Sequence, residues 1–112
     1  MKKEKNDLFF IQKILEDIQK VETYINGVSF ENYSQDDRLI DATMFRLVQI
    51  AENIKNLSSG TKSKHPEIPW EDIVGFRNRI VHDYGHTDYG IVYHVLTIDL
   101  PQVGKALGAE LK

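Results

Sequence analysis

The chain has 112 residues, which is enough for one domain with a single apolar core and too few for two. It contains no cysteine, which excludes disulfides, thiolate catalysis and cysteine-ligated zinc. The chain has 14 Lys and Arg residues and 17 Asp and Glu residues, which give a net charge of −3. This charge excludes a broad positive surface that coats nucleic acid. Any nucleic-acid chemistry must therefore come from a local site.

The first predicted helix runs from residue 6 or 7 to residue 26. Its apolar residues recur at alternating steps of three and four, the spacing of a helix in a bundle. They are Leu8, Ile11, Leu15, Ile18 and Ile25, with one turn skipped beside Val21. Asn6 or Asp7 is expected to cap its start, and Asn26-Gly27 is expected to end it.

The longest apolar run near the N-terminus covers residues 8–11 and is interrupted by Gln12 and Lys13. A run this short predicts neither a secretory signal nor a membrane span. We therefore expect a cytoplasmic protein with no membrane association.

A second helix follows a polar and aromatic stretch at residues 30–36, which predicts a turn or a short helical lead-in. The helix is expected to continue to about Ser58, where Ser58-Ser59-Gly60 ends it. Its apolar stripe comprises Ile40, Met44, Leu47, Ala51 and Ile54, widened by Val48 and Ile50. Residues 61–65 are polar and partly basic, and we expect a loop there.

A third helix is predicted after Pro66 and Pro69, with Trp70 in its first turn and Gly85 at its end. Glu71 and Asp72 suit the positive end of the helix dipole. The apolar contacts of this helix are expected from Ile73, Phe76, Ile80 and Val81, with Trp70 and Phe76 in the core.

A fourth helix is predicted to start near Asp88 and to carry Ile91, Val92, Val95 and Leu96. Pro101 should then open a final short segment containing Val103 and Leu107, because proline is tolerated at a helix start and not inside a helix. No run shows the alternation of a β-strand. The sequence therefore predicts one all-α domain over residues 1–112, an up-and-down bundle of four or five helices.

The chemically informative stretch is Phe-Arg-Asn-Arg-Ile-Val-His-Asp-Tyr at residues 76–84. Asn78 and His82 are four residues apart, so they share one face of a helix. Arg77 and Tyr84 are seven apart and are expected to stack on a neighbouring face. Arg77 and His82 differ by about 140° around the axis, but a long guanidinium can swing toward the imidazole.

These residue types are the ones that metal-independent RNA cleavage requires. A histidine such as His82 can exchange a proton near neutral pH, as base on a ribose 2′-OH or as acid on the leaving oxygen. Arg77 can hold a phosphate and stabilise the added charge of the transition state. Because one histidine cannot easily perform both transfers at once, we expect a symmetric homodimer that brings two such helices together around a shared cleft.

Simpler interpretations of the same residues remain open. Arg77 and His82 could form a buried polar pair that only sets helix packing. Arg79 and Asp83, four residues apart, suggest a surface ion pair. Tyr84 could be a core tyrosine at a helix end.

A metal site is a further alternative, because His82 and His86 are four residues apart. Gly85 between them should end the helix, however, and no accompanying carboxylate motif or cysteine is present. His65 and His94 have no partners at ligand spacing. We therefore expect neither a metal nor a cofactor.

The motif resembles that of the HEPN superfamily, in which R-x-x-x-x-H recurs, often with a polar residue after the arginine. Arg77, Asn78 and His82 match this pattern, and His82-Asp83-Tyr84 matches the H-x-Y extension of its HepT-like branch. The resemblance extends over essentially the whole chain, including Pro69-Trp70 and residues 99–101.

This resemblance implies a HEPN bundle that acts as the toxin of a type II toxin–antitoxin pair. The toxin would be an endoribonuclease in which Arg77 binds the phosphate, His82 moves the proton and Asn78 orients one of them. Its antitoxin would be a minimal nucleotidyltransferase (MNT) that neutralises it by AMPylation of Tyr84. The alternative is a non-catalytic subunit that binds nucleotide or substrate for a nucleotidyltransferase.

Overall fold

The computed structural model describes the backbone of residues 2–112 and the side chains from Asp7 onward. In chain order the elements are α1 (Lys2–Ile25), α2 (Phe30–Ser34), α3 (Asp37–Lys55), α4 (Ser59–Ser63), α5 (Trp70–His82), the 3₁₀ turn η1 (Tyr84–His86), α6 (Tyr89–His94), the π-helical segment η2 (Val95–Asp99) and α7 (Leu100–Ala109). The described backbone contains no β-strand. The predicted all-α fold is confirmed.

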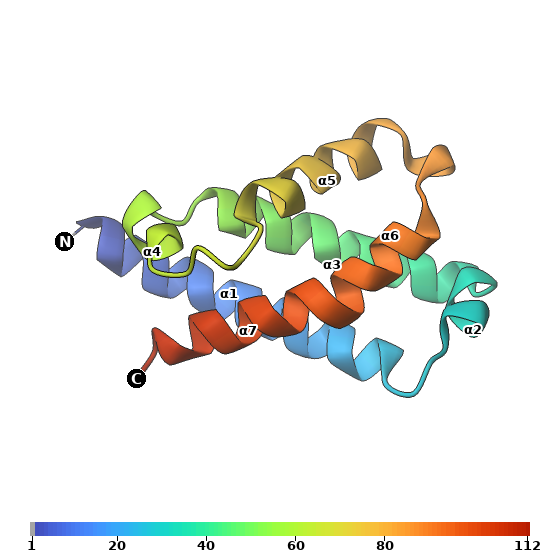
Figure 1. The fold of residues 1–112 in the computed structure, drawn as a ribbon, viewed down its shortest axis with the longest axis horizontal. Coiled ribbons are helices and arrows are strands. Elements are labelled where there is room, and N and C mark those ends of the chain that lie inside the picture. The colour runs from blue at the N-terminus through green and yellow to red at the C-terminus, as the bar shows by residue number, and fades with distance from the viewer. Residues whose placement is uncertain (1) are drawn as a thin grey trace.

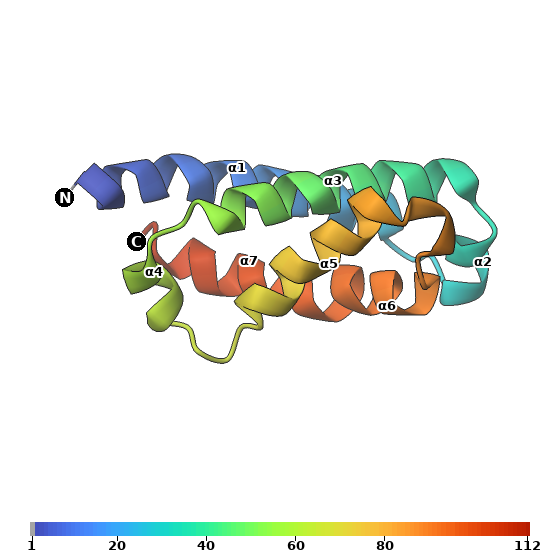
Figure 2. The same ribbon diagram turned by 90° about the horizontal axis from the view of Figure 1, so that it is seen from above.

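The long helices run alternately up and down in two layers. α1 and α3 lie side by side in one layer, and α5 and the α6–α7 segment cover them as the second (Figures 1 and 2). Both chain ends lie at the same end of the bundle (Figure 1). Within residues 2–112, no helix is both long enough and apolar enough to cross a membrane.

The core confirms the predicted stripe of α3 and corrects that of α1. The five stripe residues of α3 are all buried, as is the neighbouring Ile50. In α1 the buried apolar residues are Ile11, Ile14, Ile18 and Val21, whereas Leu8 is 48% exposed. Apolar residues at both 14 and 15 allow two registers, and the one through Ile14 and Val21 faces α3.

Two further predicted core residues lie at the surface. Val81 is 49% exposed because its neighbour Ile80 takes the inward position on α5, and Ile91 is exposed beside the buried Val92. Trp70 and Phe76 are buried as predicted. Their positions fix which face of α5 is turned away from the core.

The predicted start of the first helix is wrong. α1 already includes Lys2, so Asp7 lies inside the helix and does not cap it. The Asp7 carboxylate instead accepts hydrogen bonds from Ser58 and Thr61, more than fifty residues away. The side chain of Asn6, the other candidate cap, lies outside the described side chains.

The loop predicted at residues 61–65 is largely helical. α3 ends at Lys55, and Ser58 begins a new helix, α4, because its side chain accepts a hydrogen bond from the backbone N–H of Thr61 at 3.2 Å. The indole N–H of Trp70 donates to the carbonyl oxygens of Lys62 and His65 and so holds α4 against the start of α5. Ser58 therefore starts a helix and does not end one, and the prediction at this position is wrong.

Two predicted helix starts are confirmed, because α6 begins directly after Asp88 and Pro101 lies in the first turn of α7. Helical backbone continues from α6 through η2 into α7. In η2 the backbone N–H of Leu100 donates to the carbonyl of Val95, five residues earlier. This wider turn comes directly before Pro101, where an ordinary α-turn would bring the ring against a carbonyl.

Candidate active-site surface

The helix that carries the motif ends at His82, earlier than predicted. Asp83 leaves the helix with φ −146° and ψ 44°, and Tyr84 begins the turn η1. Asp83 and Gly85 both have low helix propensity, which favours an end before Gly85. Tyr84 therefore does not stack above Arg77 on one helix face, and the prediction that α5 continues to Tyr84 is wrong.

Arg77 is oriented by contacts on both sides. Its Nε lies 2.5 Å from Glu52 Oε1, an ion pair without the alignment of a hydrogen bond. Its Nη1 donates to Asn78 Oδ1 at 2.9 Å. A guanidinium has five N–H donors, so these two contacts leave others available for a ligand.

His82 is exposed on the last turn of α5, and its ring makes no hydrogen bond or ion pair with any residue from 7 to 112. The structure brings Arg77 and Asn78 together but does not bring Arg77 into contact with His82. The alternative of a buried Arg77–His82 pair is therefore wrong. The imidazole is accessible from solvent.

Tyr84 is anchored to α3 through its phenol. The hydroxyl donates to Asp41 Oδ1, while 43% of the residue remains exposed, so the alternative of a core tyrosine is wrong. Partial burial raises the pKa of the Tyr84 phenol, and the hydrogen bond and negative charge of Asp41 raise that pKa further. The phenol therefore holds its proton at neutral pH.

Asp41 and Glu52 are the residues that the sequence interpretation missed. They lie eleven residues apart on α3, which is three helical turns, so they share one face at a separation of about 16 Å. This spacing is the signal in the sequence that places both carboxylates on one face of α3. Contact with α5 and η1 makes both carboxylates part of the candidate site.

Arg79 points to a different side of α5. The expected ion pair with Asp83 does not form among the described residues, because Asp83 has already left the helix. Arg79 instead lines a hollow of about 300 Å³ between α5 and the α6–η2 segment, together with His94 and Asp99. It therefore provides a natural comparison for Arg77.

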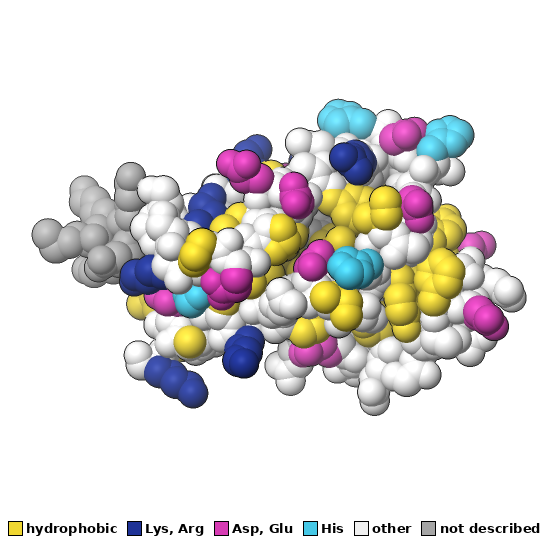
Figure 3. Space-filling model, in the orientation of Figure 1, with side chains coloured by type: hydrophobic (Ala, Val, Ile, Leu, Met, Phe, Trp, Pro, Cys, Tyr) yellow, Lys and Arg dark blue, Asp and Glu magenta, His cyan; other side chains and the backbone are white. Residues whose placement is uncertain are grey.

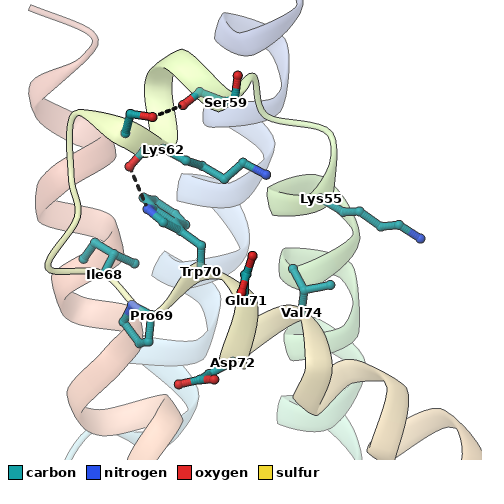
Figure 4. A pocket seen from close by; sticks show the side chains of 10 residues that line it. Lys55, Ser59, Lys62, Ile68, Pro69, Trp70, Glu71, Asp72 and Val74 are labelled. Carbon is teal, nitrogen blue, oxygen red and sulfur yellow. Dashed lines mark hydrogen bonds between the residues drawn. The ribbon is translucent and has the colours of Figure 1, made fainter.

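A larger hollow also lies away from the motif. It has about 650 Å³ and sits between the end of α3, α4 and the start of α5, where Lys62, Trp70 and Glu71 point into it (Figure 4). Around the end of α5, histidine and charged side chains lie on open surface (Figure 3). Small-molecule sites are concave, so an open polar surface suits an extended polymer better.

Comparison with known proteins finds one family over most of the chain. The family described as Ribonuclease HepT-like matches residues 14–109. A protein of Caldanaerobacter subterraneus subsp. tengcongensis, named "Putative RNase", is 29% identical over 86% of this chain and 86% of its own. The "Probable ribonuclease HepT" of Thermococcus cleftensis is 28% identical over 84% of this chain and 86% of its own. No solved structure matches the chain.

Proposed function

The chain belongs to the Ribonuclease HepT-like family, and from this premise we propose that it is a metal-independent endoribonuclease of the HEPN type. The observation that carries the proposal is the surface around the last turns of α5. Arg77, held by Glu52 and Asn78, and the exposed His82 occupy the spacing R-x-x-x-x-H there. Two relatives over most of the chain bear ribonuclease names.

The side chains divide the chemistry between them. The imidazole of His82, which forms no hydrogen bond or ion pair with residues 7 to 112, takes the proton of a ribose 2′-OH. The 2′-oxygen then attacks the adjacent phosphorus. Arg77 donates hydrogen bonds to the phosphate as negative charge builds on it. Asn78 and Glu52 limit the positions that the guanidinium can adopt. The bond from phosphorus to the 5′-oxygen breaks, and that oxygen takes a proton from a second imidazole, which leaves a cyclic phosphate end and a free 5′-hydroxyl.

A homodimer would complete this site. One exposed imidazole supplies one proton transfer, and a second copy of α5 supplies the other. Phe45 on α3 is 56% exposed and Val81 on α5 is 49% exposed. Since α3 and α5 run antiparallel between the Asp41–Tyr84 and Glu52–Arg77 contacts, these apolar residues lie at one level of the candidate site. We assign this face to contact between the two copies.

The family and the exposure of Tyr84 support the proposed biological role. The protein is proposed to be the cytoplasmic toxin of a type II pair, neutralised by a minimal nucleotidyltransferase that transfers AMP to Tyr84. The exposed phenol can be reached by another enzyme. Asp41, which contacts Tyr84, and Glu52, which contacts Arg77, are about 16 Å apart on α3. Ionic screening acts over roughly 8 Å, so the attached nucleotide must block the site mainly by its bulk.

The catalytic assignment is tested with paired substitutions in purified protein and RNA, with a chelator present. His82→Ala and Arg77→Ala should each reduce cleavage by ~10²-fold or more. His86→Ala and Arg79→Ala are the matched controls and should leave the rate nearly unchanged. Full activity of His82→Ala would favour the alternative of a non-catalytic subunit that binds nucleotide or substrate.

The modification is tested with the cognate nucleotidyltransferase, ATP and Mg²⁺. Peptide mass spectrometry should place AMP on Tyr84, and Tyr84→Phe should abolish the adduct. Tyr89→Phe is the control and should be modified like the wild type. An adduct on Tyr89 or Tyr93 in the wild-type protein would contradict the assignment.

A further inference from the structure

The phenol of Tyr84 has one anionic neighbour at hydrogen-bond distance among the described residues, the Asp41 carboxylate. Asp41 is exposed on the surface of α3, and its carboxylate makes no other hydrogen bond or ion pair with a described residue. The other titratable groups that influence the phenol are two further phenols, Tyr89 of α6 and Tyr33 of α2. Asp41 is therefore placed to receive the phenolic proton.

We propose that Asp41 is the base for nucleotide transfer to Tyr84, an inference that rests on the proposed modification of this tyrosine. Tyr84 Oη attacks the α-phosphorus of a nucleoside triphosphate brought by the partner enzyme. The Oη–P bond forms as the bond to pyrophosphate breaks, and the phenolic proton passes to Asp41. Pyrophosphate leaves with the divalent cation, so the toxin would supply part of the chemistry of its own inactivation.

A base is needed because the phenol does not ionise at neutral pH. An unperturbed tyrosine titrates near pH 10, and partial burial together with Asp41 raises the pKa of Tyr84 further. The attack must therefore begin from the neutral hydroxyl. General bases in hydrogen-bond contact with a reacting proton typically accelerate such steps by ~10²–10⁴-fold.

The same contact is lost once transfer has occurred. The modified oxygen has no proton to donate, and once Asp41 has released the transferred proton to solvent, its charge would lie against that of the new phosphodiester. Both changes remove the hydrogen bond that holds Tyr84 against α3. The attached nucleotide is then free to extend from η1 over the neighbouring surface of α5.

The test compares the initial rate of AMP transfer to wild-type protein, Asp41→Asn and Asp41→Glu by the cognate nucleotidyltransferase with ATP and Mg²⁺. Asp41→Asn keeps a hydrogen-bond acceptor beside the phenol but removes the basic oxygen. We expect transfer to slow by ~10²-fold near pH 7. The rate of this variant should then rise steadily with pH toward the titration of tyrosine, and Asp41→Glu should recover much of the rate.

The control is Asp37→Asn, which removes the same charge one turn earlier on α3. Asp37 is exposed, and its carboxylate makes no hydrogen bond or ion pair with a described residue. It should be modified at the wild-type rate. Because Asp41 is also exposed, its variants should fold, and circular dichroism checks that they do.

Each other outcome has a distinct meaning. If Asp41→Asn is modified within about threefold of the wild-type rate, Asp41 is not the base, while the proposed modification stands. A loss that is equal at every pH would show that Asp41 only positions the ring, and would also overturn the inference. If wild-type Tyr84 gains no AMP from an active partner enzyme, the proposed modification falls and the role of Asp41 falls with it.

Discussion

Asp7 offers a sharp test of how the bundle holds α4 and the start of α5. Its side chain is 4% exposed and joins α1 to the cap of α4. The carboxylate accepts hydrogen bonds from Ser58 N at 2.9 Å, Ser58 Oγ at 2.6 Å and Thr61 Oγ1 at 2.5 Å. Asp7→Asn keeps the shape of the side chain but places an NH₂ group where an oxygen accepts.

The expected loss of stability in Asp7→Asn follows from the hydrogen bonds that Oδ2 of Asp7 accepts. Oδ2 accepts from both hydroxyls, and hydrogen bonds to a charged group each contribute about 1.5–3 kcal/mol. The hydroxyls can rotate to accept from the new amide, which restores part of this energy. We expect Asp7→Asn to lower the free energy of unfolding by about 2–3 kcal/mol. At roughly 4 °C per kcal/mol for a chain of this size, Tm should fall by about 8–12 °C.

The effect should also depend on pH. Burial opposes ionisation of Asp7, but the hydrogen bonds from Ser58 and Thr61 and the charge of Lys62 outweigh it and lower the pKa of the carboxyl. A lowered pKa in the folded state stabilises the protein above the unfolded value, about 3.9. This contribution is lost as the pH falls through the folded pKa. The difference between wild type and Asp7→Asn should therefore be large at pH 7 and shrink below pH 4.

Thermal melting followed by circular dichroism measures both quantities. Glu16→Gln, which removes an exposed carboxylate from the same helix, is the control and should change Tm little. The reasoning is refuted if Asp7→Asn melts within about 2 °C of wild type at pH 7. A difference that does not shrink in acid would refute the assignment to the ionised carboxylate.

Three further predictions concern the site, the core and the assembly. Glu52→Gln should lower kcat for RNA by about tenfold without raising KM, because Arg77 loses its positioning contact but keeps its charge. A raised KM in steady-state kinetics would contradict this positioning role. Tyr33→Phe should cost only about 1 kcal/mol in urea unfolding, because Thr43 still donates to backbone carbonyls when the buried phenol is removed. Light scattering should find a dimer at micromolar concentration that Phe45→Arg shifts to monomer, and a wild-type monomer would contradict the shared site.

The sequence predicted features that depend on one helix at a time. The stripe from Ile40 to Ile54 and the helix start near Asp88 are both predicted correctly, because apolar periodicity and helix-start signals are local properties. Prediction failed where two local readings competed. Serine at position 58 is compatible with a helix end or a helix start, and the apolar pair Ile14 and Leu15 is compatible with two registers of α1.

The site divides in the same way. Arg77, Asn78 and His82 share a motif, and the sequence placed them on one helix correctly. Their partners on α3 could not be found from that motif, because the contacts of Glu52 and Asp41 depend on how α3 and α5 pack. The sequence also could not show whether Arg77 contacts His82. This depends on the side-chain rotamer of Arg77, which directs the guanidinium toward α3 and not toward the imidazole.

The central claim is that this surface cleaves RNA through the ribose 2′-OH without a metal ion. Mass spectrometry of the RNA fragments formed by purified protein in excess chelator tests it most directly. We predict 2′,3′-cyclic phosphate and 5′-hydroxyl ends from wild-type protein and from His86→Ala, and no such fragments from His82→Ala. Fragments with 5′-phosphate ends, or cleavage that stops when the chelator is added, would contradict the account.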